Sequence, residues 1–582
     1  MTWSQLDMPR AACAALLALL PLSLSACDVD PGVDDVRYEC SSSAQCGEGY
    51  ECMTDPSIQR MVCVPEGTTF ADAGADAADG GEDATDDGGD TGCGPTGCPG
   101  EFVAVRVNMS APFERGDELP ELHAHPDGDL LFSGVFKTCI TFNYEGNCPD
   151  SPNPRLSSTN AYDGFVARVG ADGSVPVLHR AQVGTSLYDV TQMLAETTVL
   201  SDGTWVAGGI QWDGIASDPA AYNSASIPFA SNKPASSIAH QAWIVRADDE
   251  GYDWATKFGW RNNDGIRQID SNASDQIMLG GEFKERIYKV PQDSEAPSVD
   301  AATIGVRDVY VQRWNADGTA EAMLRLQSAD DVKLDVAALA DDGAIAATGE
   351  FEGDLEPYYD AFETGFSEFS TTPTRSDFSA SEPGARRFLM VQPPDGSEPV
   401  IHEIGARGSI EFMEAGFDGN GDLVAVGGYA SEADFGDGPV SSNDFAGAFL
   451  ARWNPDDLSI VDLVQFDSDS NSDVFTSWDV GPQGGYMVTG QYRGDITYKQ
   501  TEFTGSGDLD GLIAEFDDGG NIVWHKVIDS EGDVFVADAA VLADGRVAAL
   551  VELPDKVTLD GQEYGGTELT TTWIFIFDPP MP

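Results

Sequence analysis

One four-strand pattern occurs seven times between Leu119 and Pro582. In each copy an apolar stretch runs into a tight turn and a second strand that usually ends in glycine. The turns lie between 60 and 78 residues apart, which leaves room for about four short strands and their loops. Regular strands with turn signals and a long repeat indicate a radial or stacked array. The turns are Asp127-Gly128, Asp202-Gly203, Ser274-Asp275, Asp342-Gly343, Asn420-Gly421, Gln483-Gly484 and Asp544-Gly545.

The third strand of each unit alternates apolar and polar residues, as in Gly164 to Val169 and Val309 to Trp314. This period of two, rich in aromatic and β-branched residues, is typical of β-strands. The seventh unit stops at Phe577 after its third strand, whereas an extra strand, Phe102 to Val107, precedes the first unit. Supplying that strand to the last unit would close a ring and remove two exposed edges. The sequence therefore predicts an all-β fold, a seven-bladed β-propeller over 101–582 whose ring is closed by an N-terminal strand.

The connections of the predicted propeller differ in length. First-to-second and third-to-fourth connections are tight hairpins, which share one face. Second-to-third connections are long, and they share the opposite face with the links between blades; we call this the long-loop face. They span 143–162, 212–241, 282–308 and 350–386. Because long loops on a rigid scaffold usually carry binding, we expect an unknown protein or glycan partner on that face.

Over 101–578 the repeat resembles the Asp/Gly-rich propeller repeats of bacterial exported proteins. Double glycines at Gly208-Gly209, Gly280-Gly281 and Gly427-Gly428 are also similar to those of Kelch repeats, although these units are longer. The third unit lacks the glycine turn and the seventh lacks the second-strand glycine. Propellers of this kind carry out binding, scaffolding and catalysis, so the resemblance does not select among these functions.

The N-terminus reads as a secretion signal. An apolar run from Ala11 to Ser25 is too short to span a bilayer and ends in Leu24-Ser25-Ala26-Cys27, which resembles the lipobox of bacterial lipoproteins. The resemblance implies a signal peptide over 1–26, a lipidated Cys27 and an anchored segment over 27–39. An ordinary signal peptide is the alternative, and Met1 or Met8 could start the chain. We expect a cell-envelope location, at the outer membrane or cell surface rather than the inner membrane, although Asp28 would favour the latter in enterobacteria.

Eight cysteines remain after the signal and the anchor, and an even number in an exported chain suggests disulfide bonds. A small module over 40–65 holds four of them in a pairing that cannot be deduced; zinc is the alternative, without a CxxC pair or a nearby histidine to support it. The other four are expected to pair as Cys93 with Cys98 and Cys139 with Cys148. The eight are Cys40, Cys46, Cys52, Cys63, Cys93, Cys98, Cys139 and Cys148.

Acidic residues dominate the chain, with 99 Asp and Glu against 31 Lys and Arg and a formal net charge of −68. Such a field repels nucleic acid and anionic lipid, so nucleic acid is not an expected partner and the membrane is reached only through the anchor. Between the module and the propeller, the linker over 66–100 contains a run of Ala, Gly, Thr and acidic residues from Ala71 to Gly92, which predicts a disordered tether.

Calcium is the one cofactor that the sequence suggests. Asp467, Asp469, Asn471 and Asp473 place oxygen atoms at alternate positions, like the first half of an EF-hand loop. Ser472 replaces the expected glycine, however, and Trp478 stands where the closing glutamate should be. A solvated inter-blade loop in an acidic protein is the alternative interpretation.

Two further sets of residues point toward the central channel. An acidic residue precedes each first strand, where it could form a ring at the channel mouth or, as we favour, cap main-chain amides. His123 and His125 could both face the channel, but ordinary strand histidines are the simpler interpretation, since a metal would need a third ligand. The acidic set is Asp117, Asp189, Asp264, Asp331, Glu411, Asp473 and Asp533.

No GxSxG, HExxH, P-loop or Rossmann glycine pattern occurs in the propeller. We therefore expect no catalytic residue and favour a non-catalytic lipoprotein that binds a protein or glycan. The alternative is an exported hydrolase or lyase with carboxylates at the channel mouth. A cluster of buried acids with shifted pKa values in one pocket would favour the enzyme, and a broad face with exposed aromatic residues would favour binding.

Overall fold

A computed structural model describes residues 50–55 and 60–65, and 102–578 with gaps. The gaps are 110–119, 144–150, 152–154, 184–191, 214–219, 223–224, 227–238, 259–264, 284–285, 289–299, 303–305, 362–372, 375–377, 379–385, 407, 443–446, 468–472, 483, 500, 506–508, 531, 555, 560–561 and 566–570. The chain divides into two compact units, Met1–Thr91 and Gly92–Pro582. All regular elements in the described residues are strands.

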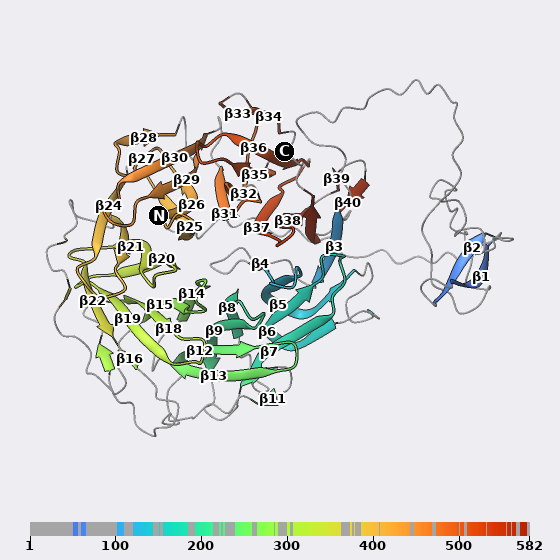
Figure 1. Cartoon of the computed structure of the whole chain (residues 1–582), viewed down its shortest axis with the longest axis horizontal. Helices are drawn as coiled ribbons and strands as arrows, with labels where there is room; N and C mark the ends of the chain where they lie inside the picture. The colour runs from blue at the N-terminus through green and yellow to red at the C-terminus, as the bar shows by residue number, and fades with distance from the viewer. Residues whose placement is uncertain are drawn as a thin grey trace, which may run out of the picture. The chain divides into compact units, whose positions relative to one another are not determined.

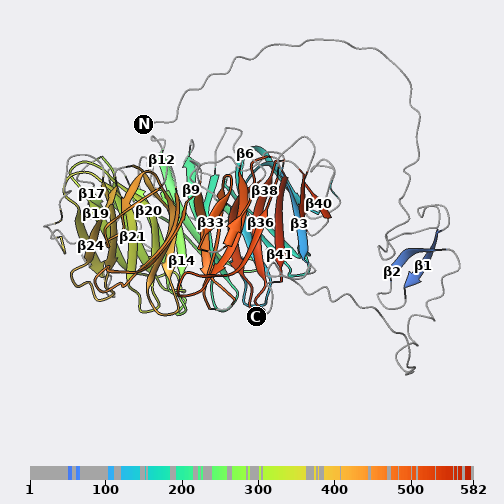
Figure 2. The same ribbon diagram turned by 90° about the horizontal axis from the view of Figure 1, so that it is seen from above.

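The second unit is a seven-bladed β-propeller, as the repeat predicts (Figure 1). Each blade is a four-stranded antiparallel sheet, and the strands run along the short axis of the ring (Figure 2). From the channel outward, blades 1 to 3 are β4 (Glu121–Ala124), β5 (Leu130–Phe142), β6 (Arg155–Val169) and β7 (Val177–Val183); β8 (Gln192–Val199), β9 (Trp205–Asp213), β12 (Ala239–Ala247) and β13 (Tyr252–Phe258); and β14 (Gly265–Ser271), β15 (Ile277–Phe283), β18 (Asp308–Trp314) and β19 (Ala320–Gln327).

Blades 4 to 7 follow the same order around the channel. They are β20 (Val332–Leu339), β21 (Ile345–Phe351), β23 (Arg386–Gln392) and β24 (Val400–Ala406); β25 (Ile410–Phe417), β26 (Leu423–Tyr429), β29 (Gly447–Trp453) and β30 (Ile460–Asp467); β31 (Val474–Val480), β32 (Tyr486–Tyr492), β35 (Asp510–Phe516) and β36 (Ile522–Ile528); and β37 (Phe535–Val541), β38 (Val547–Leu553), β41 (Thr571–Phe577) and β3 (Val103–Met109).

The first and last parts of the ring meet in blade 7. β3 pairs antiparallel with β41, from Val103 opposite Ile576 to Val107 opposite Thr572. The last residues of β3 also pair with β5 of blade 1, as at Val107 and Phe142. In the sheet order, β3 therefore lies between β41 of the last blade and β5 of the first blade.

The tight turns between first and second strands share one backbone geometry. Six of them have glycine at a positive φ, such as Gly128 at 90° and Gly343 at 89°. Blade 3 has Asp275 there at a φ of 57°, because an aspartate tolerates the left-handed region better than most residues. Blade 3, whose first-to-second turn has no glycine, therefore has the same turn geometry as the other blades.

The long second-to-third connections are not confined to the long-loop face. Their described segments run along the outer edge of the ring, where several of them pair with the outermost strand of the preceding blade. β10 (Ala220–Tyr222) pairs with β7, β22 (Glu356–Ala361) with β19, and β27 (Glu432–Asp434) with β24. The short hairpin strands in these connections are β10 with β11 (Ala225–Ser226), β16 (Arg286–Tyr288) with β17 (Asp300–Ala302), β27 with β28 (Pro439–Ser441), β33 (Ile496–Tyr498) with β34 (Thr501–Phe503), and β39 (Val557–Leu559) with β40 (Gln562–Tyr564).

These connections reach down the side of the ring to the tight-turn face. Tyr359 on β22 donates its hydroxyl to the carbonyl oxygen of Pro394, at a distance of 2.8 Å. Tyr498 on β33 donates in the same way to Gly520, at 2.7 Å. Both acceptors lie in the third-to-fourth turn of the same blade. The long loops therefore cover strand edges that would otherwise be open to pairing with other chains.

In the first unit, only a two-stranded antiparallel sheet is described. It consists of β1 (Tyr50–Asp55) and β2 (Arg60–Pro65), and its register places Cys52 opposite Cys63. Cys40, Cys46, Cys93, Cys98 and Cys148 lie outside the described residues, whereas Cys139 is buried on β5. The expected disulfide bonds, the tether and the lipidated Cys27 all remain predictions.

Candidate functional site: the central channel

A cavity of about 800 Å³ fills the centre of the ring and is lined by the first strand of every blade. Its lining holds nine carboxyl groups against three cationic side chains, Arg267, Arg307 and Lys333, and one histidine, His123. The carboxyl groups belong to Glu121, Glu196, Asp270, Glu282, Asp335, Glu411, Glu414, Asp479 and Asp538. The channel is therefore strongly anionic.

A β-bulge near the start of the first strand shapes the channel wall. The register shifts at this point in blades 2 to 7, for example between Leu194 and Glu196 and between Phe412 and Glu414. A bulge adds an unpaired residue and bends the strand locally. The residue after the bulge lies seven positions before the residue with positive φ in the turn. Across blades 1 to 7, these residues are Glu121, Glu196, Gln268, Val336, Glu414, Ser477 and Asp538.

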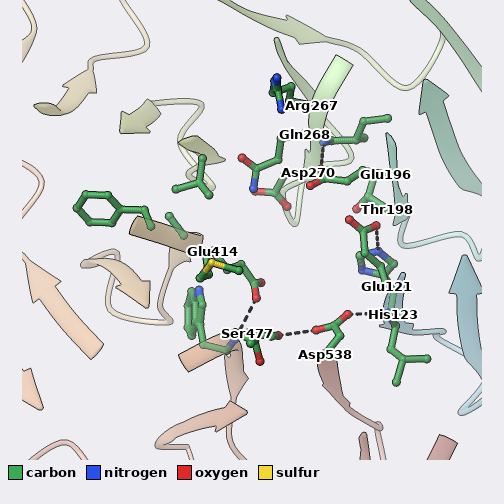
Figure 3. Close-up of a pocket in the computed structure, with 18 of the residues that line it drawn as sticks. Glu121, His123, Glu196, Thr198, Arg267, Gln268, Asp270, Glu414, Ser477 and Asp538 are labelled. Carbon is green, nitrogen blue, oxygen red and sulfur yellow. Dashed lines mark hydrogen bonds and ion pairs between the residues drawn. The ribbon is translucent and has the colours of Figure 1, made fainter. Parts of the chain in front are cut away.

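Five of these side chains accept a hydrogen bond from a main-chain amide in the next blade, always one residue beyond the equivalent position. Figure 3 includes the bonds of Glu196, Glu414 and Asp538. Glu121 accepts from Thr197 at 3.0 Å, and Glu414 accepts from Trp478 at 3.0 Å. The remaining three bonds are Glu196 with Ile269, Gln268 with Ala337, and Asp538 with Leu122. We call this set the inter-blade ring.

A second layer of acids lies two residues further along the same strands. Asp270 accepts from the Leu339 amide of blade 4 at 3.1 Å, and Asp479 accepts from the Val541 amide of blade 7 at 2.8 Å. Each aspartate also accepts the amide of the residue that follows it. Carboxyl groups in the channel thus serve first to tie neighbouring blades together.

Burial makes these acids weak. It raises the pKa of Asp270, Asp479 and Asp538 to about 6, against amide hydrogen bonds that lower it. Burial also raises the pKa of Glu196 and Glu414 well above the usual glutamate range, with help from the charges of Glu121 and Asp538 respectively. The common cause is loss of hydration of the charged form in a narrow, like-charged channel.

His123 is the one basic group deep in the channel lining. Its Nε2 lies 3.4 Å from Glu121 Oε2, and the side chain is 30% exposed. Burial lowers the pKa of His123, but the hydrogen bond and charge of Glu121, together with Asp538 and Asp270, raise it overall above its usual value. A histidine beside a carboxylate that raises its pKa can accept and return a proton.

The cations at the long-loop mouth are all paired with acids. Arg307 contacts Glu282 at 2.8 Å and Asp331 at 2.9 Å, and Lys333 lies 3.4 Å from Glu350. Arg267 lies 3.6 Å from Glu282. Glu411 lines the same mouth and is exposed. An incoming ligand therefore meets a surface that favours positive charge.

The sequence-predicted residues are only partly brought together. His125 is buried and binds the carbonyl oxygen of Gly203 through Nε2, at 2.9 Å, so of the two histidines only His123 lines the channel.

Of the acidic residues expected before each first strand, four are described, and among these only Glu411 lines the cavity. Asp473 instead accepts the Arg493 amide at 3.2 Å, Asp331 pairs with Arg307, and Asp533 lies off the channel. Asp117, Asp189 and Asp264 lie outside the described residues.

The proposed calcium loop remains untested. Asp469 and Asn471 lie outside the described residues, and Asp467 ends β30. In the part of the chain that the structure describes, no cluster of three or more histidine, cysteine or acidic side chains is arranged to hold a metal ion. The same part contains no helix long and apolar enough to cross a membrane.

Comparisons with known proteins do not assign a function. No family model and no curated protein matches the chain. A streptogramin B lyase structure aligns with a TM-score of 0.33 and 9% identity, covering 81% of this chain and 97% of the other. The extracellular domain of a putative one-component system from B. thetaiotaomicron aligns with a TM-score of 0.14 and 8% identity, covering 77% and 73%. Similarity at this level carries no argument about activity.

Proposed function

We propose that this chain is a non-catalytic cell-envelope lipoprotein whose propeller binds a positively charged group of a protein or glycan at the long-loop mouth of its channel. The observation that carries the proposal is the channel lining, where nine carboxyl groups face three cations that are already paired. Because the described long loops cover the outer edge of the ring, the channel is a better binding site than the loops themselves.

The lipobox, the tether and the ring that β3 completes support the same arrangement. Cys27 would hold the chain at a membrane, the acidic segment 66–100 would keep the propeller at a distance, and the closed ring would present a rigid site. Substituting Cys27→Ala should abolish labelling with palmitate and release the protein into the soluble fraction. A substituted protein that still labels and sediments with membranes would contradict the anchor.

Capture on intact cells tests the binding role. The compact unit Gly92–Pro582 is immobilised beside a variant that carries Glu411→Lys at the channel mouth. We expect the unmodified unit to retain a cell-surface protein or glycan in a salt-sensitive manner, because exposed charges are screened by salt. The variant should retain much less. Equal capture by both proteins would refute a role for the anionic mouth.

A hydrolase or lyase is the second candidate, favoured by the contact between His123 and Glu121 and by the raised pKa of His123. In this role His123 would accept a proton from the substrate and return it to a leaving group. Replacing His123→Gln should abolish turnover while cell capture persists. Activity profiling of the unmodified unit against exported glycans, with no product formed, would eliminate this candidate.

A further inference from the structure

The inter-blade ring is interrupted between blades 4 and 5. Val336 occupies the ring position in blade 4, where the other blades have Glu, Gln, Ser or Asp. The corresponding amide in blade 5 belongs to Ala415, and the valine side chain offers it no acceptor. Thr197, Ile269, Ala337, Trp478 and Leu122 occupy the same place in five other blades, and each of these amides is bonded to a side chain of the preceding blade. In blade 7 the Ala539 amide donates to Asp538 of its own blade, and Ser477 of blade 6 joins the two blades by donating its hydroxyl to Asp538.

A second cavity begins beside this interruption. It measures about 660 Å³, opens between the tight turns of blades 3 to 6, and shares Ala415 and Trp478 with the central cavity. Ala340, Ala415 and Gly416 supply small residues to its lining. The two cavities therefore meet beside the missing ring bond, and the second has room for a single sugar residue.

Trp478 supplies an unsatisfied donor at this place. The residue is only 8% exposed, and its indole Nε1–H has no hydrogen-bond partner among the described residues. The indole lies against Gly416, since a Cβ added there would stand 2.6 Å from Cζ2 of Trp478. Burying an N–H group without an acceptor costs free energy, and an acceptor atom on a bound ligand would offset that cost.

Acids surround the same space. Asp270, Glu414 and Asp479 line both cavities. Each oxygen of Asp270 and Asp479 accepts one main-chain amide, and a carboxylate oxygen can accept a further hydrogen bond. The site thus combines negative charge with N–H donors. A bare metal ion would satisfy the acids but be repelled by the donors, whereas an organic ammonium ion with a nearby oxygen satisfies both.

We propose that the interruption between blades 4 and 5 is a binding site for an amino sugar residue. The ammonium group would contact Asp270, Asp479 and Glu414, and sugar oxygens would accept from the Ala415 amide and the Trp478 indole. The inference rests on the proposed function in assigning a positively charged ligand to the channel, but it places that ligand toward the tight turns and away from Glu411 at the long-loop mouth.

Calorimetry with the full chain tests the site, with glucosamine as the probe and glucose as its neutral counterpart, at a pH that protonates the amine. Val336→Gln introduces at the interruption the kind of side chain that blade 3 has at Gln268. This side chain can accept a hydrogen bond from the Ala415 amide and fill the space. We expect glucose to bind at least tenfold more weakly than glucosamine. Val336→Gln should weaken glucosamine at least tenfold, and Trp478→Phe severalfold. Glu563→Gln, on the outer hairpin β39–β40, should have no effect.

Thermal unfolding of each variant shows whether it is folded. Glucosamine binding that is unchanged in folded Val336→Gln, equal binding of glucose, or no binding of glucosamine by the unmodified chain would each overturn the inference. The cell-capture experiment separates these results from the proposed function. Capture that still depends on Glu411 would leave the anionic mouth in place as a binding site for another cationic group.

Discussion

The inner and outer edges of the blades reverse the roles that their sequences suggest. The outer edge carries long, variable connections of the kind that usually bind ligands, yet in the structure these segments pair with neighbouring strands and pack against turns. The inner edge is built from short apolar strands, yet it brings nine carboxyl groups into one cavity. Loop length alone is therefore a poor guide to the working part of this propeller.

The largest effect should come from breaking the ring itself. Deleting residues 102–108 removes all of β3 except Met109, including the fully buried Val105, and exposes the edge of β41. We expect loss of the cooperative fold and aggregation, because an unpaired buried strand seeks another partner. Deleting 71–92 should leave the melting temperature of the propeller unchanged. Similar melting curves for the two deletions would show that the closure is dispensable.

At the outer edge, Phe435 tests whether the long loops are structural. It follows β27, is buried in the core between blades 4 and 5, and accepts the indole N–H of Trp453 through its carbonyl oxygen at 2.9 Å. Phe435→Ala should destabilise the propeller by about 3–5 kcal/mol, as expected for removing a buried phenylalanine. Denaturant unfolding gives the value. A decrease of less than about 1 kcal/mol in the free energy of unfolding would mean that this connection contributes little to stability and could act as a binding loop.

At the inner edge, stability should depend on pH. Carboxyl groups of the unfolded chain titrate near pH 4, whereas Asp270, Asp479 and Asp538 titrate at about 6 in the fold. Between these values the folded protein keeps protons that the unfolded chain has lost. The stability that these groups contribute is therefore greatest below about pH 4 and is lost as the pH rises from 4 through 6, by about 1 kcal/mol for each group after allowance for channel water.

Melting temperatures between pH 5 and 7.5 check this expectation, and the double variant Asp270→Asn, Asp479→Asn should show a flatter profile. His123 acts in the same direction, since its raised pKa also favours the fold at lower pH. A melting temperature that climbs steadily from pH 5 to 7.5 in the unmodified protein would mean that the channel acids are fully ionised and well solvated.

The same contrast explains what could be read from the sequence. The seven turns and the alternating third strands gave the propeller, because turn chemistry and strand period are local properties. The ring position is also visible in the sequence, as a polar residue seven places before the turn residue with positive φ in six of seven blades, but local patterns point instead to the acids just before each first strand. Asp331 and Asp473 share a sequence position, but one pairs with Arg307 and the other with a main-chain amide. Such contacts depend on the adjacent blade, which no local pattern describes.

The smallest expected effect distinguishes structure from charge within the inter-blade ring. Glu196→Gln keeps an acceptor for the Ile269 amide, as Gln268 does for Ala337 in the next blade, and removes a charge that burial disfavours. At pH 7 the free energy of unfolding should change by less than about 1 kcal/mol. Glu196→Leu removes the acceptor and leaves a buried amide unpaired, which should cost about 1–3 kcal/mol. If leucine is tolerated as well as glutamine, the ring bonds contribute little to holding the blades together, and the acids of the inner edge are retained for their charge alone.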